Sequence, residues 1–126
     1  MTKKRILVVD DDINIRLLLR ITLEEEGYGV IEARDGEEAI ARFKETAVDL
    51  VIADMVMPHK DGISMLLEIR QLSPSVPVVA ISGGAYLDSE HYLELARLVG
   101  VKHTFSKPVD RKALLATIAE VLKGAA

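Results

Sequence analysis

The sequence predicts an α/β protein with one five-stranded parallel sheet and helices on both of its faces. Three observations support this fold. Short apolar runs alternate with amphipathic helical patterns along the chain. The runs are apolar at nearly every position, which is typical of strands buried on both faces. The runs also end in polar, reactive residues, and the carboxyl ends of parallel strands form the binding edge of such a sheet.

The chain opens with a strand and a long amphipathic helix. Residues 5–9 are apolar and partly β-branched, as in a buried strand. Residues 13–26 carry apolar side chains at the i, i+3, i+4 and i+7 spacing of a helix, and Gly27 provides a C-terminal stop. The side chains that we expect to face the sheet are Ile15, Leu18, Leu19, Thr22 and Leu23.

A second strand and helix and a third strand complete the first half of the chain. Residues 30–33 form the shorter second strand, and Asp35-Gly36 forms a turn before a helix over residues 37–46. This helix would bury Ala39, Ile40 and Phe43. Residues 49–53 form the third strand, which again is apolar at nearly every position.

A loop over residues 55–60 leads into the third helix and the fourth strand. The sequence predicts Asp61 as the N-cap of a helix that continues to residue 72. Pro74 and Pro77 bracket the approach to a fourth strand over residues 76–81.

The last two helices flank a short fifth strand. Gly83-Gly84 precedes a helix over residues 87–99, which Gly100 ends, and residues 102–105 form the strand. The final helix, residues 110–123, carries the apolar side chains Leu114, Leu115, Ile118, Val121 and Leu122. Right-handed crossovers and the strand order 2-1-3-4-5 would make strands one and three central neighbours.

Length and composition describe one ordinary globular domain. The chain has 126 residues, of which 49% are hydrophobic and 29% charged, and we expect a single domain over residues 1–126 with no output domain. A net charge of -4 argues against direct nucleic-acid binding. The chain has no cysteine, no apolar stretch of membrane-spanning length and no signal-peptide pattern, so the cytoplasm is the expected location.

The polar residues that end the strands predict metal-assisted phosphoryl chemistry. Asp10, Asp11 and Asp54 would lie side by side, and three adjacent carboxylates need a cation or protons to offset their repulsion. An oxygen-only set suits Mg²⁺, and an aspartate can attack phosphorus. Lys107 and the Ser82 hydroxyl would compensate the phosphoryl oxygens. Each residue alone is typical of a cap, a turn or the surface, but the ordered set favours the chemical interpretation.

Four motifs in order resemble the receiver domain of two-component response regulators. The motifs are Ile6-Leu7-Val8-Val9-Asp10-Asp11-Asp12, Asp54-Met55-Val56-Met57-Pro58-His59-Lys60-Asp61-Gly62, Ala80-Ile81-Ser82-Gly83 and Ser106-Lys107-Pro108. The resemblance covers essentially the whole chain. It implies a flavodoxin-like (βα)5 sandwich and a chemotaxis-regulator-like module that is not a turnover enzyme.

The resemblance also implies a role for each site residue. Asp54 would accept a phosphoryl group from a phosphohistidine of a sensor histidine kinase or histidine phosphotransfer protein. Asp11 and Asp54 would bind Mg²⁺ directly, together with the backbone carbonyl of Val56, and Asp10 would act through a metal-bound water. Lys107 and Ser82 would contact the phosphoryl group. Asp12 is a weaker candidate.

One position departs from the family pattern, and two others bear on how long the phosphoryl group stays on the acceptor. Thr104 stands where the family usually has the Tyr or Phe that moves inward on activation. Either His103 or Tyr86 substitutes for that ring, or His103 is an ordinary surface histidine, which is the interpretation we favour. We expect Phe105 to point into the core and activation to reorder the Gly83-Gly84 loop more than it flips a ring. Val56 and Gly84 offer no side chain to polarise water, which predicts slow self-dephosphorylation.

The first helix predicts a partner surface. Ile13, Leu17 and Ile21 form an outward apolar stripe, which is either ordinary surface or a docking strip for the helical phosphodonor. We expect signalling through an unknown downstream protein, without nucleic acid or membrane, as a monomer or a phosphorylation-dependent dimer. The alternatives are a receiver excised from a larger regulator and an aspartate-nucleophile phosphohydrolase. A flavodoxin-like cofactor binder lacks the required phosphate loop.

Overall fold

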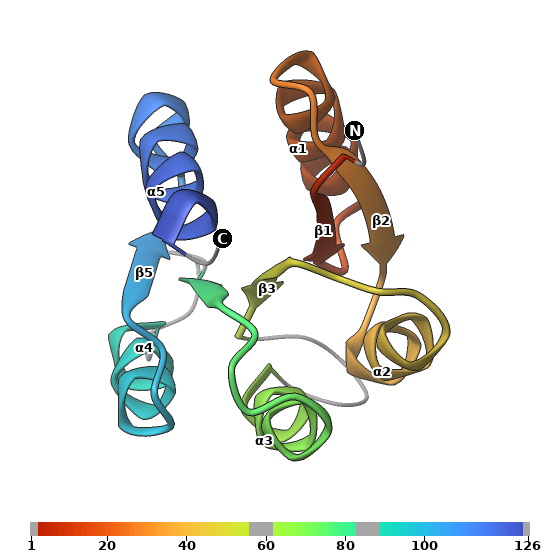
Figure 1. The fold of residues 1–126 in the computed structure, drawn as a ribbon. Helices are drawn as coiled ribbons and strands as arrows, with labels where there is room; N and C mark the ends of the chain where they lie inside the picture. Colours follow the sequence, from red (N-terminus) through yellow and green to blue (C-terminus); the bar gives the residue numbers. More distant parts are fainter. Residues whose placement is uncertain (1–2, 56–61, 83–88, 125–126) are drawn as a thin grey trace.

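The computed structural model describes residues 3–55, 62–82 and 89–124, and within them strands and helices alternate as predicted. The strands are β1 (Arg5–Val9), β2 (Gly29–Ala33), β3 (Leu50–Asp54), β4 (Val78–Ser82) and β5 (His103–Ser106). The helices are α1 (Ile13–Glu25), α2 (Gly36–Glu45), α3 (Gly62–Leu72), α4 (Ser89–Leu98) and α5 (Arg111–Gly124). Figure 1 shows them as one layered body.

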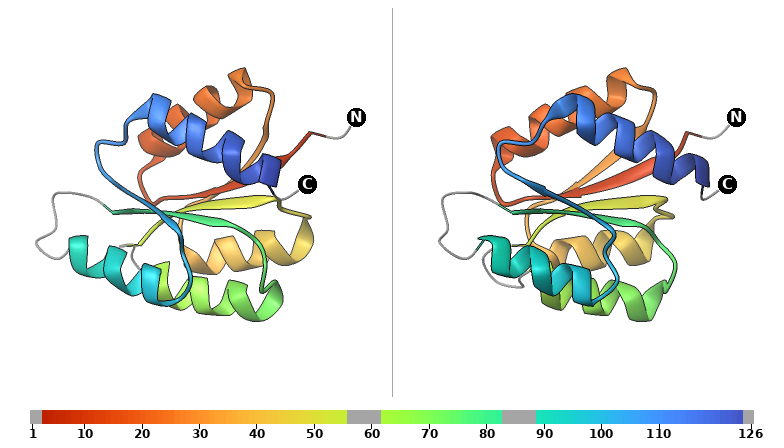
Figure 2. Two further views of the ribbon diagram at one scale, coloured as in Figure 1. Left: turned by 60° about the vertical axis from the view of Figure 1, so that its left-hand side comes forward. Right: turned by 90° about the vertical axis from the view of Figure 1, so that its left-hand side faces the viewer.

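The sheet has the predicted topology. Its strand order is β2-β1-β3-β4-β5, and every neighbouring pair is parallel. Helices α1 and α5 cover one face, while α2, α3 and α4 cover the other, as Figures 1 and 2 both show. The predicted α/β sandwich with order 2-1-3-4-5 is therefore confirmed, and β1 and β3 are central neighbours.

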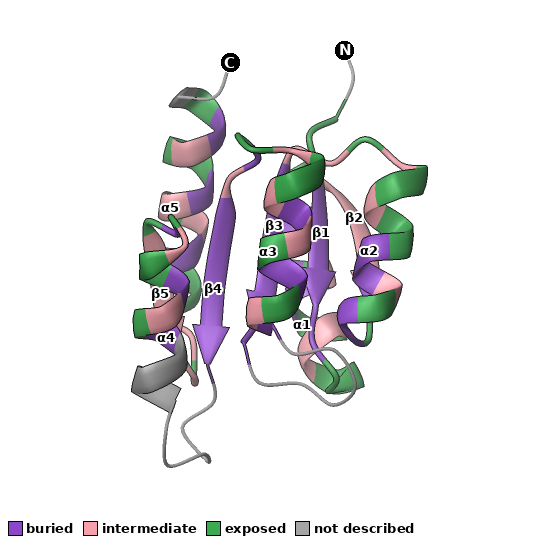
Figure 3. Cartoon of the chain, turned by 90° about the horizontal axis from the view of Figure 1, so that it is seen from below, coloured by how far each residue is buried: buried purple, intermediate pink, exposed green. Residues whose placement is uncertain are grey.

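The sheet separates two apolar cores. Strands β3 and β4 are buried along their whole length, and Figure 3 shows the central strands as a continuous buried layer. The core on the α2–α4 side is centred on Leu7, Val51 and Leu66, and the core on the α1–α5 side on Ile6, Ile52 and Leu114. Burying side chains on both faces explains why the strands are apolar at nearly every position.

Three predicted strands begin and end later than expected, and the shift of β5 from residues 102–105 to His103–Ser106 is the smallest of them in consequence. The structure extends β3 to Asp54 and β4 to Ser82, so that both polar residues are the last residue of a strand. Strand β4 also begins at Val78, immediately after Pro77, because proline has no N–H to donate to the sheet. The polar side chains thus stand on sheet backbone and not on a loop.

Helix α1 follows the prediction except at one residue. Leu19, Thr22 and Leu23 are buried, and Gly27 beyond the helix has a φ of 92° that favours glycine. The prediction for Leu18 is wrong, since its side chain is 61% exposed. The buried stripe of α1 is narrower than the apolar pattern, and Leu18 lies beside an open groove between α1 and α5. None of the described helices is both long and apolar enough to cross a membrane.

Candidate functional site

Three aspartates meet at the carboxyl edge of the central strands. Val9 of β1 pairs with Ala53 of β3, so the next residues, Asp10 and Asp54, are neighbours across the sheet. Asp10, Asp11 and Asp54 each offer a carboxylate oxygen, and these oxygens lie within 4.8 Å of one another. Asp10 is 2% and Asp54 4% exposed, whereas Asp11 is exposed. The cluster is therefore rooted in the sheet and opens to solvent beside Asp11.

Lys107 bridges the two buried carboxylates. Its Nζ donates to Asp10 Oδ2 at 2.8 Å and to Asp54 Oδ2 at 2.9 Å. The Lys107 backbone N–H also donates to the Ser82 carbonyl at 2.9 Å, which fixes the residue beside the end of β4. Burial of the ammonium lowers the pKa of Lys107, but the hydrogen bonds and charges of Asp10 and Asp54 outweigh that effect and raise the pKa above its ordinary 10.5.

Ser82 places a buried hydroxyl at the end of β4, beside the acidic cluster. The residue is 0% exposed, and its Oγ is without a hydrogen-bond partner among the described residues. Leaving a buried polar group unsatisfied costs about 1–3 kcal/mol. Such a group at the end of β4, on the strand next to Asp54, is suited to donate to an acceptor that arrives at the site.

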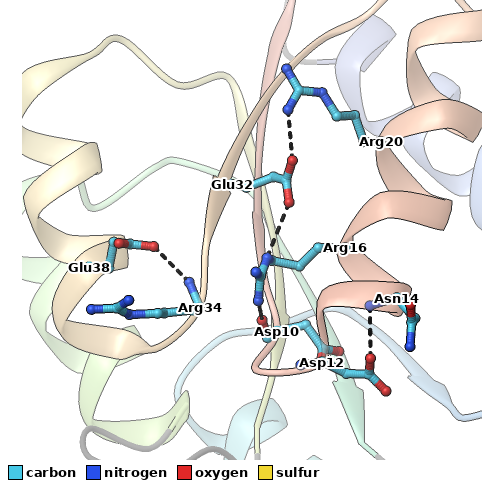
Figure 4. A network of polar contacts seen from close by, with 8 residues as sticks. All are labelled: Asp10, Asp12, Asn14, Arg16, Arg20, Glu32, Arg34 and Glu38. Atoms are coloured by element: carbon cyan, nitrogen blue, oxygen red, sulfur yellow. Dashed lines mark hydrogen bonds and ion pairs between the residues drawn. The ribbon is translucent and has the colours of Figure 1, made fainter.

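The third aspartate of the run has a structural role. Asp12 is the N-cap of α1, and its carboxylate accepts from the Asn14 N–H at 2.8 Å. Its own N–H donates to Asp10 Oδ1 at 2.9 Å and thereby orients the Asp10 carboxylate. Figure 4 shows the Asp12 carboxylate directed toward Asn14. Asp12 thus caps the helix, in line with its weaker standing as a ligand candidate.

A metal fits the donor set of this cluster. All of the clustered ligands are carboxylate oxygens, which suit a hard divalent cation. One ammonium cannot offset three carboxylates, so the cluster retains an excess of negative charge that a cation would neutralise. Val56, whose carbonyl was the further predicted ligand, lies outside the described residues.

Comparison with known proteins identifies the family. A family model described as "Response regulator receiver domain" matches residues 6–119. The chain belongs to this family. The chemotaxis protein CheY of Treponema pallidum is 39% identical to the receiver domain over 122 residues, which cover 94% of this chain and 83% of that protein. The transcriptional regulatory protein CpxR of Klebsiella pneumoniae is 37% identical over 119 residues, and the chain spans 49% of its length.

Solved structures agree with this assignment. A CheY-like receiver domain protein of Methanospirillum hungatei JF-1 has a TM-score of 0.89 and 30% identity, with 98% of this chain and 96% of that chain covered. The response regulator TrrA of Thermotoga maritima, solved in complex with Mg(2+)-BeF, has a TM-score of 0.82 and 35% identity, with 94% and 98% covered. Receiver domains are phosphorylation-based signalling modules, and this chain is one of them.

At position 104 this receiver domain has a threonine in place of the aromatic residue expected from the family resemblance. Arg97 of α4 donates through Nη2 to the Thr104 hydroxyl at 2.9 Å. Phe105 packs against the core on the α1–α5 side, as predicted, and His103 is half-buried. Thr104 therefore connects β5 to α4 by a polar contact in place of a ring. Tyr86 and the Gly83-Gly84 loop lie outside the described residues.

Gly62 and Arg16 also support the receiver site, although the sequence analysis assigned no role to either residue. A Cβ on Gly62 would lie 2.4 Å from Met55 Cα and 2.7 Å from the Asp54 carbonyl oxygen, so α3 can begin this close to the acceptor strand only at a glycine. Arg16 donates through Nη1 to the Asp10 carbonyl at 2.7 Å. The Asp61-Gly62 pair in the sequence was a signal that could have identified Gly62, but no local pattern marks Arg16.

An apolar groove leads away from the acidic cluster of the receiver domain. It lies between α1 and α5 and encloses about 790 Å³. Asp11, Asp54 and Lys107 line its polar end, while the apolar lining comes from Ile15, Leu18, Leu19, Ile81, Val109 and Leu114. The exposed Ile13, Leu17 and Ile21 lie on the same helix outside the groove, so the predicted outward stripe is confirmed as exposed.

Proposed function

We propose that this receiver domain accepts a phosphoryl group on Asp54 and thereby controls contacts with other proteins. The observation that carries the proposal is that the buried Asp54 carboxylate, the Lys107 ammonium and the Ser82 hydroxyl, which has no hydrogen-bond partner among the described residues, lie at one sheet edge. A nucleophile, a cation and a hydroxyl donor are the groups that stabilise a phosphoryl group on an acceptor.

The proposed reaction transfers one phosphoryl group from a histidine nitrogen to an aspartate oxygen. The phosphorus–nitrogen bond of a donor phosphohistidine breaks, and an Asp54 carboxylate oxygen forms the new phosphorus–oxygen bond. The donor nitrogen keeps the electron pair and takes up a proton. Lys107 would then move its ammonium from the Asp54 carboxylate to a phosphoryl oxygen, and Ser82 would donate its hydroxyl to another. Phosphorylation would add about one to two negative charges at Asp54, and this change would rearrange the surrounding contacts.

We assign Mg²⁺ as the metal of the acidic cluster. Asp11 and Asp54 would hold it directly with the Val56 carbonyl, and Asp10 would act through a metal-bound water. The bound cation would neutralise charge on the carboxylates and on the incoming phosphoryl group. The similarity to TrrA, which was solved in complex with Mg(2+)-BeF, supports this choice.

The phosphodonor in this proposal is a sensor histidine kinase or histidine phosphotransfer protein that docks on α1. Ile13, Leu17 and Ile21 are exposed on this helix, and the groove beside Leu18 leads to Asp54. An amphipathic donor helix could cover the stripe and present its histidine to the cluster. Leu17→Glu should slow transfer from the kinase and spare labelling by a small phosphodonor, and equal loss of both would reject this surface.

The output of the module is proposed to be protein–protein contact. We propose that residues 1–126 form one receiver domain whose target is a separate protein, with no direct nucleic-acid or membrane binding. The module would be a monomer or a phosphorylation-dependent dimer. The alternative is that the chain is the receiver part of a longer regulator. Its cytoplasmic location stays a prediction that cell fractionation would check. Val56 and Gly84 predict an aspartyl phosphate that outlasts seconds in the isolated protein.

One experiment tests the acceptor. Incubation with Mg²⁺ and acetyl phosphate should add one phosphoryl group, measured by intact mass, and Asp54→Asn should abolish the addition. Omitting Mg²⁺ provides the metal control, and Asp12→Asn is a matched acidic variant that should still be labelled. Absence of labelling in the wild type would overturn the proposal. Continuous turnover of a phosphomonoester would instead indicate a phosphohydrolase.

A further inference from the structure

Arg16 makes a contact at the metal cluster that the proposed chemistry does not itself require. The residue lies in the first turns of α1, and its side chain is 14% exposed. Its Nη1 donates to the Asp10 carbonyl at 2.7 Å, and its Nε donates to Glu32 Oε1 of β2 at 3.1 Å. Figure 4 shows the guanidinium held between these two acceptors. The planar guanidinium donates in two fixed directions, so both contacts together determine where it lies.

Four backbone groups on either side of Asp11 are hydrogen-bonded: the N–H and the carbonyl of Asp10 and of Asp12. The Asp10 N–H donates to the Ala33 carbonyl at 3.1 Å, and the Asp10 carbonyl accepts from Arg16. The Asp12 N–H donates to Asp10 Oδ1, and the Asp12 carbonyl accepts from the Arg16 N–H at 3.0 Å. Arg16 therefore contributes two of these contacts, one from its side chain and one from its backbone.

Asp11 depends on this support more than its neighbours do. It is exposed, so packing does not fix its side chain, and the direction of its carboxylate follows from the backbone on either side. Asp10 has a further support, since Lys107 contacts its Oδ2 at 2.8 Å. Groups behind the ligands of a metal site commonly set ligand orientation, and their loss typically weakens metal binding by about 10–100-fold.

We propose that Arg16 is a positioning residue for the metal cluster, acting through the Asp10 carbonyl with Glu32 as its anchor. This inference rests on the proposed metal role of Asp10, Asp11 and Asp54. Arg16 fixes the backbone from which Asp10 and Asp11 project, so the carboxylates are already in place when the cation arrives. Preorganisation of this kind strengthens binding because no ordering cost remains for the ligand to offset.

Arg20 offers a matched control on the same helix. It also pairs with Glu32, through Nη1 at 2.7 Å, and with Glu24 at 3.4 Å. Figure 4 shows it at the far side of Glu32 from Asp10. Arg20→Met therefore removes one positive charge and one Glu32 contact from α1 but leaves the Asp10 carbonyl bound to Arg16.

The test compares Mg²⁺ binding by the full chain in Arg16→Met, Arg16→Lys and Arg20→Met, using calorimetric titration. We expect Arg16→Met to raise the Mg²⁺ dissociation constant about tenfold and Arg20→Met to change it less than about twofold. Arg16→Lys keeps the charge but not the two-direction geometry, so it should also weaken binding. If Arg16→Met does not fold, the Mg²⁺ dissociation constants of Arg16→Lys and Glu32→Gln are compared with that of Arg20→Met instead.

A second readout needs no metal. Amide hydrogen exchange of the Asp12 N–H in the metal-free protein should accelerate about tenfold in Arg16→Met and stay unchanged in Arg20→Met. Wild-type Mg²⁺ affinity in a folded Arg16→Met protein would overturn this inference and leave the proposed function intact. Failure of the wild type to bind Mg²⁺ would overturn both. Equal weakening by Arg16→Met and Arg20→Met would indicate a charge effect and reject positioning.

Discussion

The two halves of the sheet edge differ in how completely their polar groups are satisfied. On the β1 side, Asp10 is contacted by Lys107, by the Asp12 N–H and, at its carbonyl, by Arg16. On the β4 side, the buried Ser82 hydroxyl has no partner among the described residues. In the half that would hold the metal, hydrogen bonds and an ion pair already fix the Asp10 carboxylate and carbonyl. In the half that would contact the phosphoryl group, the Ser82 hydroxyl is still able to donate a hydrogen bond. A metal site needs groups that are already in place, whereas a response to phosphorylation needs a donor that can still form a bond, so β1 and β4, on either side of β3, meet opposite requirements.

The largest expected effect comes from removing Lys107. Lys107→Met leaves the buried Asp10 and Asp54 carboxylates side by side without their cation, and breaking such a pair is strongly destabilising. We expect the free energy of unfolding to fall by about 2–4 kcal/mol without Mg²⁺. Saturating Mg²⁺ should recover part of that loss, because it replaces the missing charge. Urea unfolding with and without Mg²⁺ measures both, and unchanged stability would show that the β1 half does not depend on this bridge.

Ser82→Ala should have the opposite balance of effects. It removes a buried hydroxyl that has no described partner, so the free energy of unfolding should stay the same or rise by up to about 1 kcal/mol. The response to beryllofluoride, followed by chemical-shift changes in α4, should be strongly reduced. Ser106→Ala is the matched control, because Ser106 is the exposed partner of Ser82 in the sheet. A clear loss of stability in Ser82→Ala would break the contrast between the halves.

Alkaline pH provides a third comparison. Because the folded pKa of Lys107 is raised above 10.5, its contribution to stability is fully present below that value and is lost as the pH rises through the folded pKa. The wild type should therefore lose more stability than Lys107→Met as the pH rises above 10.5. Urea midpoints of the two proteins across this range measure the difference. Parallel curves would contradict the assigned role of the ammonium.

The smallest effect is expected at Thr104. Thr104→Val removes the hydroxyl that accepts from Arg97 while keeping the branched shape, and stability should change by about 0.5 kcal/mol or less. The midpoint of the beryllofluoride response in α4 should shift by about twofold if this contact biases the helix. Thr104→Ser retains the hydroxyl and should resemble the wild type. Identical behaviour of the Val and Ser variants would remove Thr104 from the response.

The sequence predicted the fold and the meeting of the site residues because both depend on local pattern. Continuous apolar runs indicate buried parallel strands, and strand order then brings Asp10, Asp11 and Asp54 together. The exposure of Leu18 was not predictable, since it depends on how far α1 and α5 lie apart and not on periodicity. The contact of Arg16 with Asp10 and Glu32 spans β1, α1 and β2, and no spacing rule encodes such a three-element contact.

The division of the core by the sheet has an evolutionary consequence. Within the part of the chain that the structure describes, the buried side chains beneath α1 and α5 form one apolar cluster and those beneath α2, α3 and α4 form another. Substitutions on the two faces should therefore be nearly additive, with little epistasis between them. The surface proposed to choose a phosphodonor can diversify after gene duplication without disturbing the helix that Thr104 contacts. Under the proposed function, the phosphodonor specificity of α1 could therefore change in evolution while the packing of α4 is preserved.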